Sequence, residues 1–227
     1  MKLLEAGAVL ALAMTMAPIA TAAPARDKAE TVVLPAGRTG RPFPLEKALS
    51  ERRSVREFSR APLRLAEIAQ VLWAAQGVTA RGGYRTAPSA GGLWPLEVYV
   101  AAQRVEQLAP GVYRYEPSAH RLVRTSGEDR SAELARAAYG QEWLREAPAI
   151  LVITGVERRT TGKYGQRGVR YVFMEAGHAA QNALLQAIAL GLGATVVGAF
   201  NDGKVQALLG VDAGEIPLYL VPVGRPR

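Results

Sequence analysis

Apolar positions recur at helical spacing in two long parts of the chain. Within residues 63–77, "LRLAEIAQVLWAAQG", they follow one another at intervals of three or four, and Gly77 supplies a stop signal. The stretch from Val172 to Leu192 is rich in alanine and apolar on nearly every side, so it requires cover on all sides. We therefore expect one helix over 63–77 and a central one over 169–193, buried in the domain or packed against its copy in a dimer.

Shorter patterns predict the remaining elements. Alternating or continuous apolar runs predict strands over 96–103, 111–117, 120–126, 147–155, 194–200 and 216–224. Short helices are expected over 44–54, 132–140 and 204–210. The second and third strands are joined by the turn "PSA", which predicts an antiparallel hairpin. Helices and strands interspersed around such a hairpin indicate an α+β fold in one domain, residues 43–227.

The N-terminal residues have a different character. Lys2 precedes an apolar stretch, and small residues follow it up to Ala22, which is typical of a secretory signal peptide over 1–22. The chain would then be periplasmic or secreted, with no stable membrane span after cleavage. Glu5 is unusual in a basic leader, so an uncleaved anchor or a cytoplasmic protein is the alternative. Residues 23–42 are rich in Pro, Gly and Ala, which predicts a flexible linker.

Composition narrows the chemistry. The chain has 227 residues, 49% of them hydrophobic, which is enough to build one sizeable core. It has no cysteine, which excludes thiol nucleophiles, disulfides and thiolate metal sites. The net charge is +8, but the basic residues are scattered along the sequence, so we expect no nucleic-acid partner.

Several familiar sites lack the partners they need. His120 and His178 are the only histidines, and Ser89 lies in no G-x-S-x-G elbow, so a Ser-His-Asp hydrolase is not expected. Glu175 and His178 stand three apart on one helix, but no second such pair exists. We therefore predict no metal site and interpret them as a polar pair facing a cavity or an interface. The glycines of "GLGATVVGAF" close a helix and open a strand, the reverse of a dinucleotide fingerprint.

The strongest candidate for binding is "RRSVREF", residues 52–58. Three arginines and a serine within five positions offer many hydrogen-bond donors to a phosphate. Val55 and Phe58 alternate into the fold and anchor the segment, and only Glu51 and Glu57 lie near enough in sequence to neutralise it. A phosphate site and a solvated charged face both remain open on these grounds.

Taken in order, a set of motifs resembles the FMN-dependent nitroreductase family. The motifs are "RRSVREF", "APSAGGLWPLEVYV", "GHAAQNALLQAIALGLG" followed by "VVGAF", and a closing "PVGRP". The resemblance covers residues 45–227 and is strongest to the SagB-type branch, which includes the azoline dehydrogenases of thiazole/oxazole peptide biosynthesis. It implies a nitroreductase-like α+β fold with a central, mostly antiparallel sheet flanked by helices. It also implies a homodimer, with the long buried helix at its interface and an FMN in each of two interface sites.

The resemblance further implies which residues bind the cofactor. By this resemblance, the FMN phosphate and the pyrimidine edge of the ring are bound by Arg52, Arg53, Ser54 and Arg56. Arg225 and Arg227 would complete the phosphate site. The wall of the partner subunit's flavin is expected from Pro88, Ser89, Ala90, Gly91, Gly92 and Leu93, with Trp94 as a lid or interface anchor. Main-chain N–H groups near flavin N5 are expected from Val197, Gly198 and Ala199. A flavin carries its own redox chemistry, which suits a chain without cysteine.

Two details refine this resemblance. Gly92 stands where much of the family has Asn, and Trp94 where the SagB-type branch usually has Tyr. Within "GKYGQRGVRY", Lys163 and Tyr164 resemble the Lys-Tyr pair that is associated with removal of the substrate proton in azoline dehydrogenases. They are the candidate catalytic residues. The alternative is a surface Lys163 beside a packed Tyr164, because a lysine base requires burial to lower its pKa.

Together these inferences predict an FMN-dependent oxidoreductase that transfers hydride through flavin N5. A small molecule or a peptide is the expected substrate, and NAD(P)H is a candidate electron donor. Export conflicts with part of this interpretation, because azoline dehydrogenases act on cytoplasmic precursor peptides and NAD(P)H has no obvious supply outside the cytoplasm. The alternative function is a non-catalytic flavin or related ligand-binding protein of the cell envelope.

Overall fold

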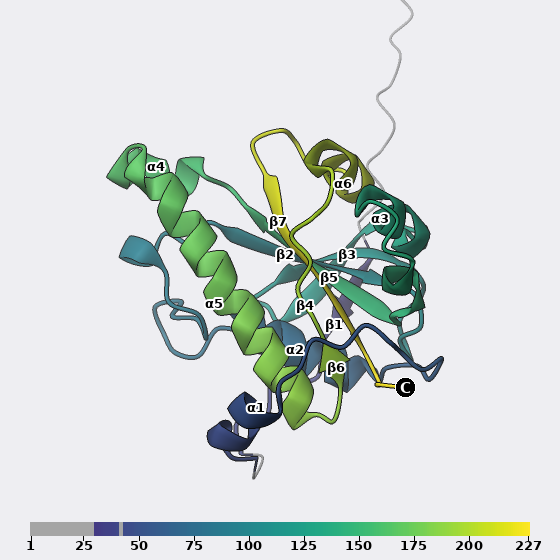
Figure 1. Cartoon of the computed structure of the whole chain (residues 1–227). Coiled ribbons are helices and arrows are strands. Elements are labelled where there is room, and N and C mark those ends of the chain that lie inside the picture. The colour runs from purple at the N-terminus through teal and green to yellow at the C-terminus, as the bar shows by residue number, and fades with distance from the viewer. Residues whose placement is uncertain (1–29, 41–42) are drawn as a thin grey trace, which may run out of the picture.

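A seven-stranded sheet forms the centre of the molecule in the computed structural model, which describes residues 30–40 and 43–227 (Figure 1). Its strand order is β1-β4-β3-β2-β5-β7-β6, and every neighbouring pair is antiparallel. In that order, the strands are Thr31–Val33, Arg121–Ser126, Gly111–Glu116, Leu96–Ala102, Ala149–Gly155, Ile216–Gly224 and Gly193–Ala194. The expected α+β class and central antiparallel sheet are confirmed.

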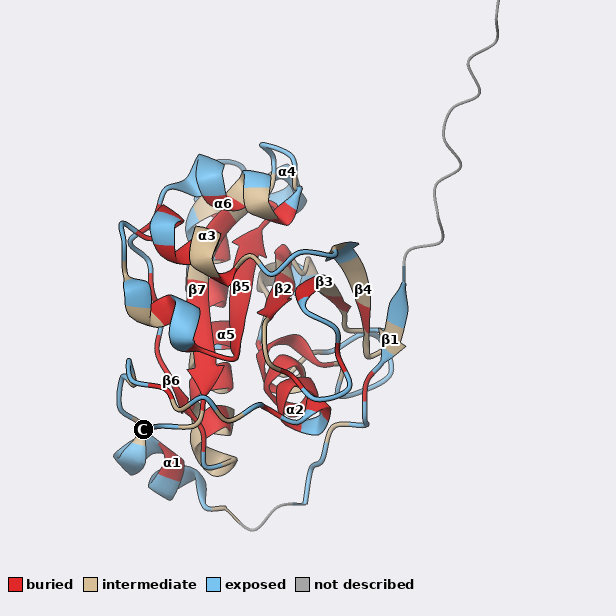
Figure 2. Cartoon of the chain, turned by 90° about the vertical axis from the view of Figure 1, so that its right-hand side faces the viewer, coloured by how far each residue is buried: buried red, intermediate tan, exposed pale blue. Residues whose placement is uncertain are grey.

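Helices cover both faces of the sheet, as Figures 1 and 2 show. Residues of α2 and α5 share one apolar core with the sheet, and residues of α3 and α6 share a second core on the opposite face. The helices are α1 (Leu45–Glu51), α2 (Leu65–Gln76), α3 (Ser131–Ala137), α4 (Arg158–Tyr164), α5 (Arg167–Ala189) and α6 (Asp202–Leu209). Two 3₁₀ turns, Ala90–Gly92 and Glu142–Glu146, complete the list.

Strand β5 illustrates how its sequence fits this three-layer arrangement. Leu151 and Ile153 belong to the core with α2 and α5, whereas Ile150 and Val152 belong to the core with α3 and α6. Successive side chains point to opposite faces of a sheet, so this strand is buried on both sides. That is why its sequence is apolar throughout instead of alternating with polar residues.

The long helix α5 crosses one face of the sheet and contacts α1, α2 and α4 (Figure 1). Its inner face is made largely of alanines, among them Ala179 and Ala183, both fully buried. The expectation of cover on all sides holds only for this inner face in a single chain. Phe173 and Met174 are 50% and 49% exposed, so these two apolar side chains on the outer side of α5 remain uncovered.

The described part of the predicted linker, residues 30–40, is ordered against the domain instead of flexible. Thr31–Val33 add a strand to β4 at the edge of the sheet. Beyond it, the main-chain N–H of Leu34 donates to the carbonyl of His120 at 3.0 Å, and the Leu34 side chain is buried. Three residues are too few to show the alternation that predicts a strand. The predicted signal peptide lies outside the described residues.

Side chains fasten this N-terminal segment further along. Gln70 of α2 accepts the Arg38 main-chain N–H at 2.7 Å and donates to the Arg38 carbonyl at 3.1 Å. The His120 ring bonds the Pro35 carbonyl through Nε2 and the Tyr115 hydroxyl through Nδ1, each at 2.8 Å. Both ring nitrogens are thereby used in holding the segment, which explains one of the two histidines without any catalytic role.

Two further expectations differ from the structure. The strand predicted over 194–200 is reduced to the short β6, after which only an isolated bridge between Val197 and Leu220 continues the pairing. Helix α4 was not predicted, because its sequence "RRTTGKY" carries no apolar periodicity. Within the described residues, no helix is both long and apolar enough to cross a membrane.

Candidate functional site

The arginine segment 52–56 is fixed beside β6 by main-chain pairing. The Val55 N–H donates to the carbonyl of Ala194 at 3.2 Å, and Ser54 forms a bridge with the same residue. This approach requires a glycine in β6, because a Cβ atom on Gly193 would lie 2.7 Å from Val55 Cγ1. Phe58 is 1% exposed in the core, as its alternation with Val55 predicted. The backbone of the segment is therefore rigid while its basic side chains face outward.

These basic side chains are not neutralised by neighbouring carboxylates. Arg53 donates to the carbonyls of Ser50 and Arg52, and the Arg56 guanidinium lies 5.7 Å from the ring centroid of Trp143. Within the described residues, Arg52, Arg53 and Arg56 form no ion pair. The segment therefore retains the donors that an anionic ligand needs.

The segment Val197–Ala199 lies near the same end of the sheet, but only part of it can serve a ligand. The Val197 N–H donates to the carbonyl of Leu220 at 2.8 Å, so it is already occupied, contrary to the expectation for this residue. Gly198 and Ala199 are exposed, and in the described part of the chain their N–H groups find no acceptor. Gln141 orients this segment by donating to the Ala199 carbonyl at 3.3 Å.

The two C-terminal arginines point to different places. Arg225 donates to both carboxylate oxygens of Glu67, at 3.0 and 3.1 Å. Glu67 is 2% exposed; burial alone would raise its pKa, but hydrogen bonds from Arg64 and Arg225 outweigh burial and hold the pKa below its usual value. Arg227 instead donates to Glu146 and to the Phe58 carbonyl, each at 3.3 Å, and lines a cavity of about 600 Å³ together with Phe58. The structure thus pairs Arg225 with the buried Glu67 and places Arg227 beside the last residue of the motif 52–58.

The glycine loop, residues 88–93, is a tight turn with left-handed backbone positions. Gly91 and Gly92 have φ of +64° and +65°, and the following Trp94 has φ of +49°. The Gly92 N–H donates to the Ser89 carbonyl at 3.1 Å, and the Trp94 N–H donates to the Ser89 hydroxyl at 2.9 Å. Glycine adopts such φ values without steric cost, so the glycines allow the chain to turn with its backbone exposed.

Two arginines hold the indole end of this loop. The Arg85 guanidinium lies 5.0 Å from the ring centroid of Trp94, and Arg159 donates to the Trp94 carbonyl at 3.0 Å. Arg159 also bonds Glu97 at 2.6 Å, which ties the loop to β2. Sequence reasoning did not identify these two arginines, because they lie on either side of the loop in sequence and share no motif with it.

The candidate catalytic pair lies directly against the glycine loop. A Cβ atom on Gly91 would be 2.8 Å from Tyr164 Oη and 3.1 Å from Lys163 Nζ. The Tyr164 ring also packs edge-on against Tyr171 of α5, with centroids 5.2 Å apart. Lys163 is exposed in the single chain, whereas Tyr164 is half-buried. The structure therefore joins the predicted wall and the predicted catalytic pair into one cluster.

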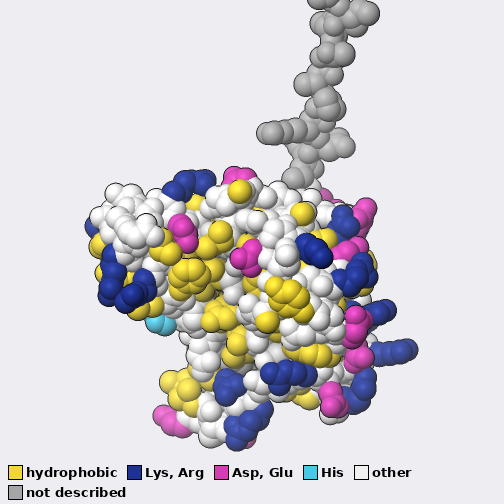
Figure 3. All heavy atoms as spheres, turned by 45° about the horizontal axis from the view of Figure 1, so that its top comes forward, with side chains coloured by type: hydrophobic (Ala, Val, Ile, Leu, Met, Phe, Trp, Pro, Cys, Tyr) yellow, Lys and Arg dark blue, Asp and Glu magenta, His cyan; other side chains and the backbone are white. Residues whose placement is uncertain are grey.

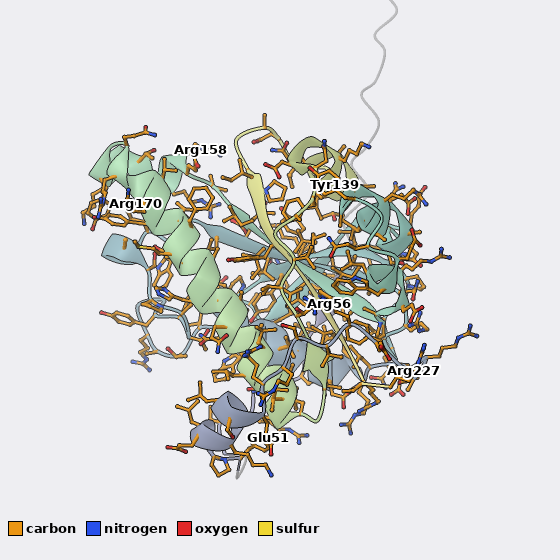
Figure 4. All side chains as sticks on the ribbon, in the orientation of Figure 1. Glu51, Arg56, Tyr139, Arg158, Arg170 and Arg227 are labelled. Carbon is orange, nitrogen blue, oxygen red and sulfur yellow. The ribbon has the colours of Figure 1, made fainter. Side chains whose placement is uncertain are left out.

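The predicted site residues thus fall into two clusters at opposite ends of α5. The first end carries the glycine loop and α4, and the second lies beside α1, the arginine segment and β6. Figure 4 shows this separation through Arg170 at the first end and Glu51 near the second. Glu175, which contacts the loop, and Ala189, which lines a groove with Ala48 of α1, are separated by about 21 Å at 1.5 Å of rise per residue. One chain alone does not bring the two clusters together.

Charge on the surface follows no single patch in the view of Figure 3. Lys and Arg side chains are interspersed there with acidic and hydrophobic ones. Ion pairs such as Arg121–Glu116 and Arg130–Glu128 account for part of the positive charge. On that face, the basic side chains are therefore dispersed instead of gathered in one patch.

This arrangement, an antiparallel sheet with helices on both faces, an exposed arginine segment near one end of α5 and a glycine loop near the other, defines a nitroreductase-like α+β protein. Residues 49–225 match the Nitroreductase family, so the chain belongs to that family of oxidoreductases. A relative from Methanocaldococcus jannaschii, MJ1384, is 48% identical over 181 residues, which are 80% of this chain and 90% of the relative. Its name assigns it provisionally as a nitroreductase.

Two further comparisons refine the relationship. A crystal structure from Ralstonia eutropha, also described provisionally as a nitroreductase, has a TM-score of 0.77 and 31% identity and covers 91% of this chain and 93% of its own. The microcin B17-processing protein McbC of Escherichia coli is 31% identical over 143 residues, or 60% of this chain and 52% of McbC. The chain is thus a distant homologue of the SagB-type azoline dehydrogenase branch and spans about half of McbC.

The nitroreductase family typically binds FMN, and the residues present fit that cofactor. The cationic groups at Arg52, Arg53 and Arg56 have no carboxylate partner in the described ranges, which suits a phosphate. The N–H groups of Gly198 and Ala199 are unoccupied donors beside them, which suits the polar edge of a flavin ring. Arg225 is half-exposed and could share its guanidinium between Glu67 and a phosphate.

Proposed function

We propose that this protein is a homodimeric FMN-dependent oxidoreductase whose two sites are each built from both subunits. The observation that carries the proposal is the division of the predicted site into two clusters at opposite ends of α5. Bound FMN supplies hydride transfer through its N5 atom. A second copy laid antiparallel along the outer side of α5 would bring the glycine loop of one chain to the arginine segment of the other. Phe173 and Met174, both about half exposed, support such a contact.

In this proposal the arginine segment holds the cofactor. Arg52, Arg53, Ser54 and Arg56 bind the phosphate and the pyrimidine edge, with Arg225 as an additional cation. Gly198 and Ala199 donate main-chain hydrogen bonds to the ring. Because the backbone of both segments is fixed by pairing with β6 and β7, these donors are preorganised and lose little freedom on binding.

The cluster formed by the glycine loop, Lys163 and Tyr164 acts on the substrate. The glycine loop presents a thin wall without side chains at Gly91 and Gly92, which leaves room for a flat substrate. Lys163 and Tyr164 lie beside that wall, where a neutral amine or a phenolate can accept a proton of the substrate and the resulting ammonium or phenol can hold it. We propose a small molecule or a peptide as substrate. NAD(P)H is the proposed electron donor for a cytoplasmic protein, whereas an exported protein requires a different donor. A flavin binder without turnover is the alternative outcome of the test below.

Subunit complementation tests the shared site. Arg56→Ala damages one half-site and Gly91→Val damages the other, so each homodimer should lose flavin-dependent turnover. In a mixed dimer, one site carries both changes and the other carries neither. Random pairing should therefore restore about one quarter of the wild-type activity per chain, because half of the dimers hold one intact site.

The matched control places both changes on one chain and pairs it with Arg56→Ala. No intact site can form in that mixture, so no activity should return. Recovery in the control, or none in the test mixture, would contradict the shared site. Purified wild-type protein that shows no absorbance at about 450 nm after incubation with FMN and removal of the free FMN would contradict flavin binding itself.

We also propose that the protein is exported and that its leader ends near Ala22. The support is the sequence alone, in which a basic start, an apolar stretch and small residues follow one another. N-terminal sequencing of the protein isolated from its native cells tests this. A mature form beginning between Ala23 and Arg26 is expected, whereas an intact Met1 would overturn the proposal.

A further inference from the structure

Glu175 is a buried carboxylate without a cationic partner in contact. It lies on the inner side of α5 and is 4% exposed. No ion pair to Glu175 occurs within residues 30–40 and 43–227. Removing a charged carboxylate from water is costly unless hydrogen bonds compensate for it. The position of this side chain therefore requires an explanation.

Its hydrogen bonds come from the glycine loop. Glu175 Oε1 accepts the Ala90 main-chain N–H at 2.7 Å and the Ser89 hydroxyl at 3.1 Å. The same hydroxyl accepts the Trp94 N–H at 2.9 Å, so the carboxylate, the serine and the end of the loop form one chain of hydrogen bonds. Bonds to an ionised acceptor are about twice as strong as neutral ones. The fold of the loop is thus built on this carboxylate.

The loop in turn limits the place of the catalytic pair. Gly91 follows the two residues that Glu175 binds, and it lies against Tyr164 Oη and Lys163 Nζ. A shift of the loop toward α4 would bring its backbone into these atoms. Three elements, α5, the loop and α4, are therefore mechanically connected through Glu175 and Gly91.

Other roles for Glu175 have less support. A metal site would need a third ligand, and no cluster of three or more His, Asp or Glu side chains is found in the described part of the chain. His178, three positions along α5, is exposed. A role in fold stability alone is also unfavourable, because burial raises the pKa of Glu175, an effect only partly offset by Ala90, Ser89, His178 and Arg85.

We propose that Glu175 is a positioning residue that fixes the glycine loop and, through Gly91, sets the place of Lys163 and Tyr164. This inference deepens the proposed function and rests on it for the catalytic consequence. The anchoring itself is a property of the single chain and does not depend on flavin.

The direction in which Glu175→Gln changes the unfolding midpoint distinguishes a positioning role from a purely structural one. The raised pKa means that the folded protein is more stable with Glu175 protonated than with Glu175 ionised, relative to the unfolded chain. Its contribution to stability is present below the ordinary value of 4.5 and is lost as the pH rises through the raised value. Glu175→Gln removes the buried charge and should keep or raise the unfolding midpoint at pH 7. A residue retained for stability alone would show a lower midpoint.

Hydrogen–deuterium exchange of the intact protein tests the anchor directly. In Glu175→Gln, the amides of Ala90 and Trp94 should exchange about tenfold faster than in the wild type, because a neutral acceptor replaces an ionised one. Ser89→Ala should accelerate exchange of the Trp94 amide in the same way, because it removes the hydroxyl that accepts this N–H. In the wild type, this exchange, corrected for intrinsic rates, should rise as the pH falls through the ionisation of Glu175.

Control variants show which titrating group causes the pH-dependent rise in amide exchange. Charged or titratable groups facing Glu175 are Arg85 from the preceding segment, His178 on α5, and Lys163 and Tyr164 beyond Gly91. The His178→Gln variant should retain the pH dependence of exchange at Ala90 and Trp94, and the Glu175→Gln variant should lose it. Turnover in Glu175→Gln should fall about tenfold, in parallel with the faster exchange.

Unchanged exchange at Ala90 and Trp94 in Glu175→Gln would overturn the anchor, whatever the activity. A lower unfolding midpoint in this variant, with unchanged pH dependence, would also overturn it. Faster exchange in a protein that binds no flavin would support the anchor and contradict only the proposed function.

Discussion

Tyr164 Oη lies 2.8 Å from the point that a Cβ atom of Gly91 would occupy. Gly92, the next residue, has almost the same φ, yet nothing lies within 4 Å of its Cβ position. The two glycines therefore share one backbone conformation and differ in what surrounds them. This pair of glycines allows the effect of backbone strain to be separated from the effect of the contact with the candidate catalytic residues Lys163 and Tyr164.

Gly91→Ala is expected to reduce turnover at least tenfold more than Gly92→Ala. Both variants pay a similar cost for a left-handed alanine, about 1–2 kcal/mol, but only Gly91→Ala also displaces Tyr164 and Lys163. Thermal unfolding should show comparable losses of stability for the two variants, and steady-state turnover should separate them. Equal turnover would show that the contact with Tyr164 has no catalytic importance.

Tyr164→Phe is expected to lower turnover about a hundredfold while leaving the unfolding midpoint nearly unchanged. Phenylalanine keeps the edge-on packing against Tyr171, whose ring centroid is 5.2 Å away, and loses only the hydroxyl. Tyr171→Phe is the matched control, because it removes a hydroxyl from the same aromatic pair. If both variants retain activity, the phenol of Tyr164 takes no part in proton transfer and Tyr164 only packs.

Arg56→Ala is expected to weaken FMN binding by about tenfold to a hundredfold, the usual worth of a charge-assisted hydrogen bond. The side chain is exposed, so stability should change little. Arg227→Ala should weaken binding by no more than about threefold, because the Arg227 guanidinium already donates to both the Phe58 carbonyl and Glu146. Fluorescence titration of FMN measures both. A larger loss at Arg227 would place the phosphate nearer to the C-terminus than the structure indicates.

Glu67→Gln should destabilise the fold by about 1–3 kcal/mol at pH 7, because the hydrogen bonds from Arg64 and Arg225 lose their ionised acceptor. The pKa of Glu67 lies below its ordinary value of 4.5, so its contribution is present above pH 4.5 and is lost as the pH falls toward the lowered value. Urea unfolding at several pH values should show a shallower acid dependence in the variant. Glu67→Gln and Glu175→Gln thus have opposite expected effects on stability at two buried glutamates.

The strongly periodic elements could be predicted from the sequence, and the weakly patterned ones could not. Helix α2 ends at Gln76, one residue before the stop signal Gly77, and β5 matches its continuous apolar run. Helix α4 is polar and is held by close packing on α5, since a Cβ atom on Gly168 would lie 2.8 Å from the Thr160 carbonyl carbon. Contacts of this kind leave no periodic trace in the sequence.

The candidate site shows the same division. The arginine segment and the glycine loop could be found because each is contiguous in sequence. The role of Glu175 could not, since its donors lie 85 and 86 residues away and its neighbour His178 suggested a different pairing. The resemblance suggested the Val197 N–H as a donor to the ligand, but this N–H is paired with the Leu220 carbonyl, a contact that the resemblance does not specify.

The position of β1 has a consequence for how this domain could be attached to other structures. β1 and β6 are the opposite edges of the seven-stranded sheet, about 29 Å apart at 4.8 Å per strand. The arginine segment lies beside β6, and the described chain begins at β1. An anchor or fusion partner joined ahead of Thr31 would therefore tether the domain by one edge of the sheet, leaving the edge with the arginine segment facing away from the attachment point.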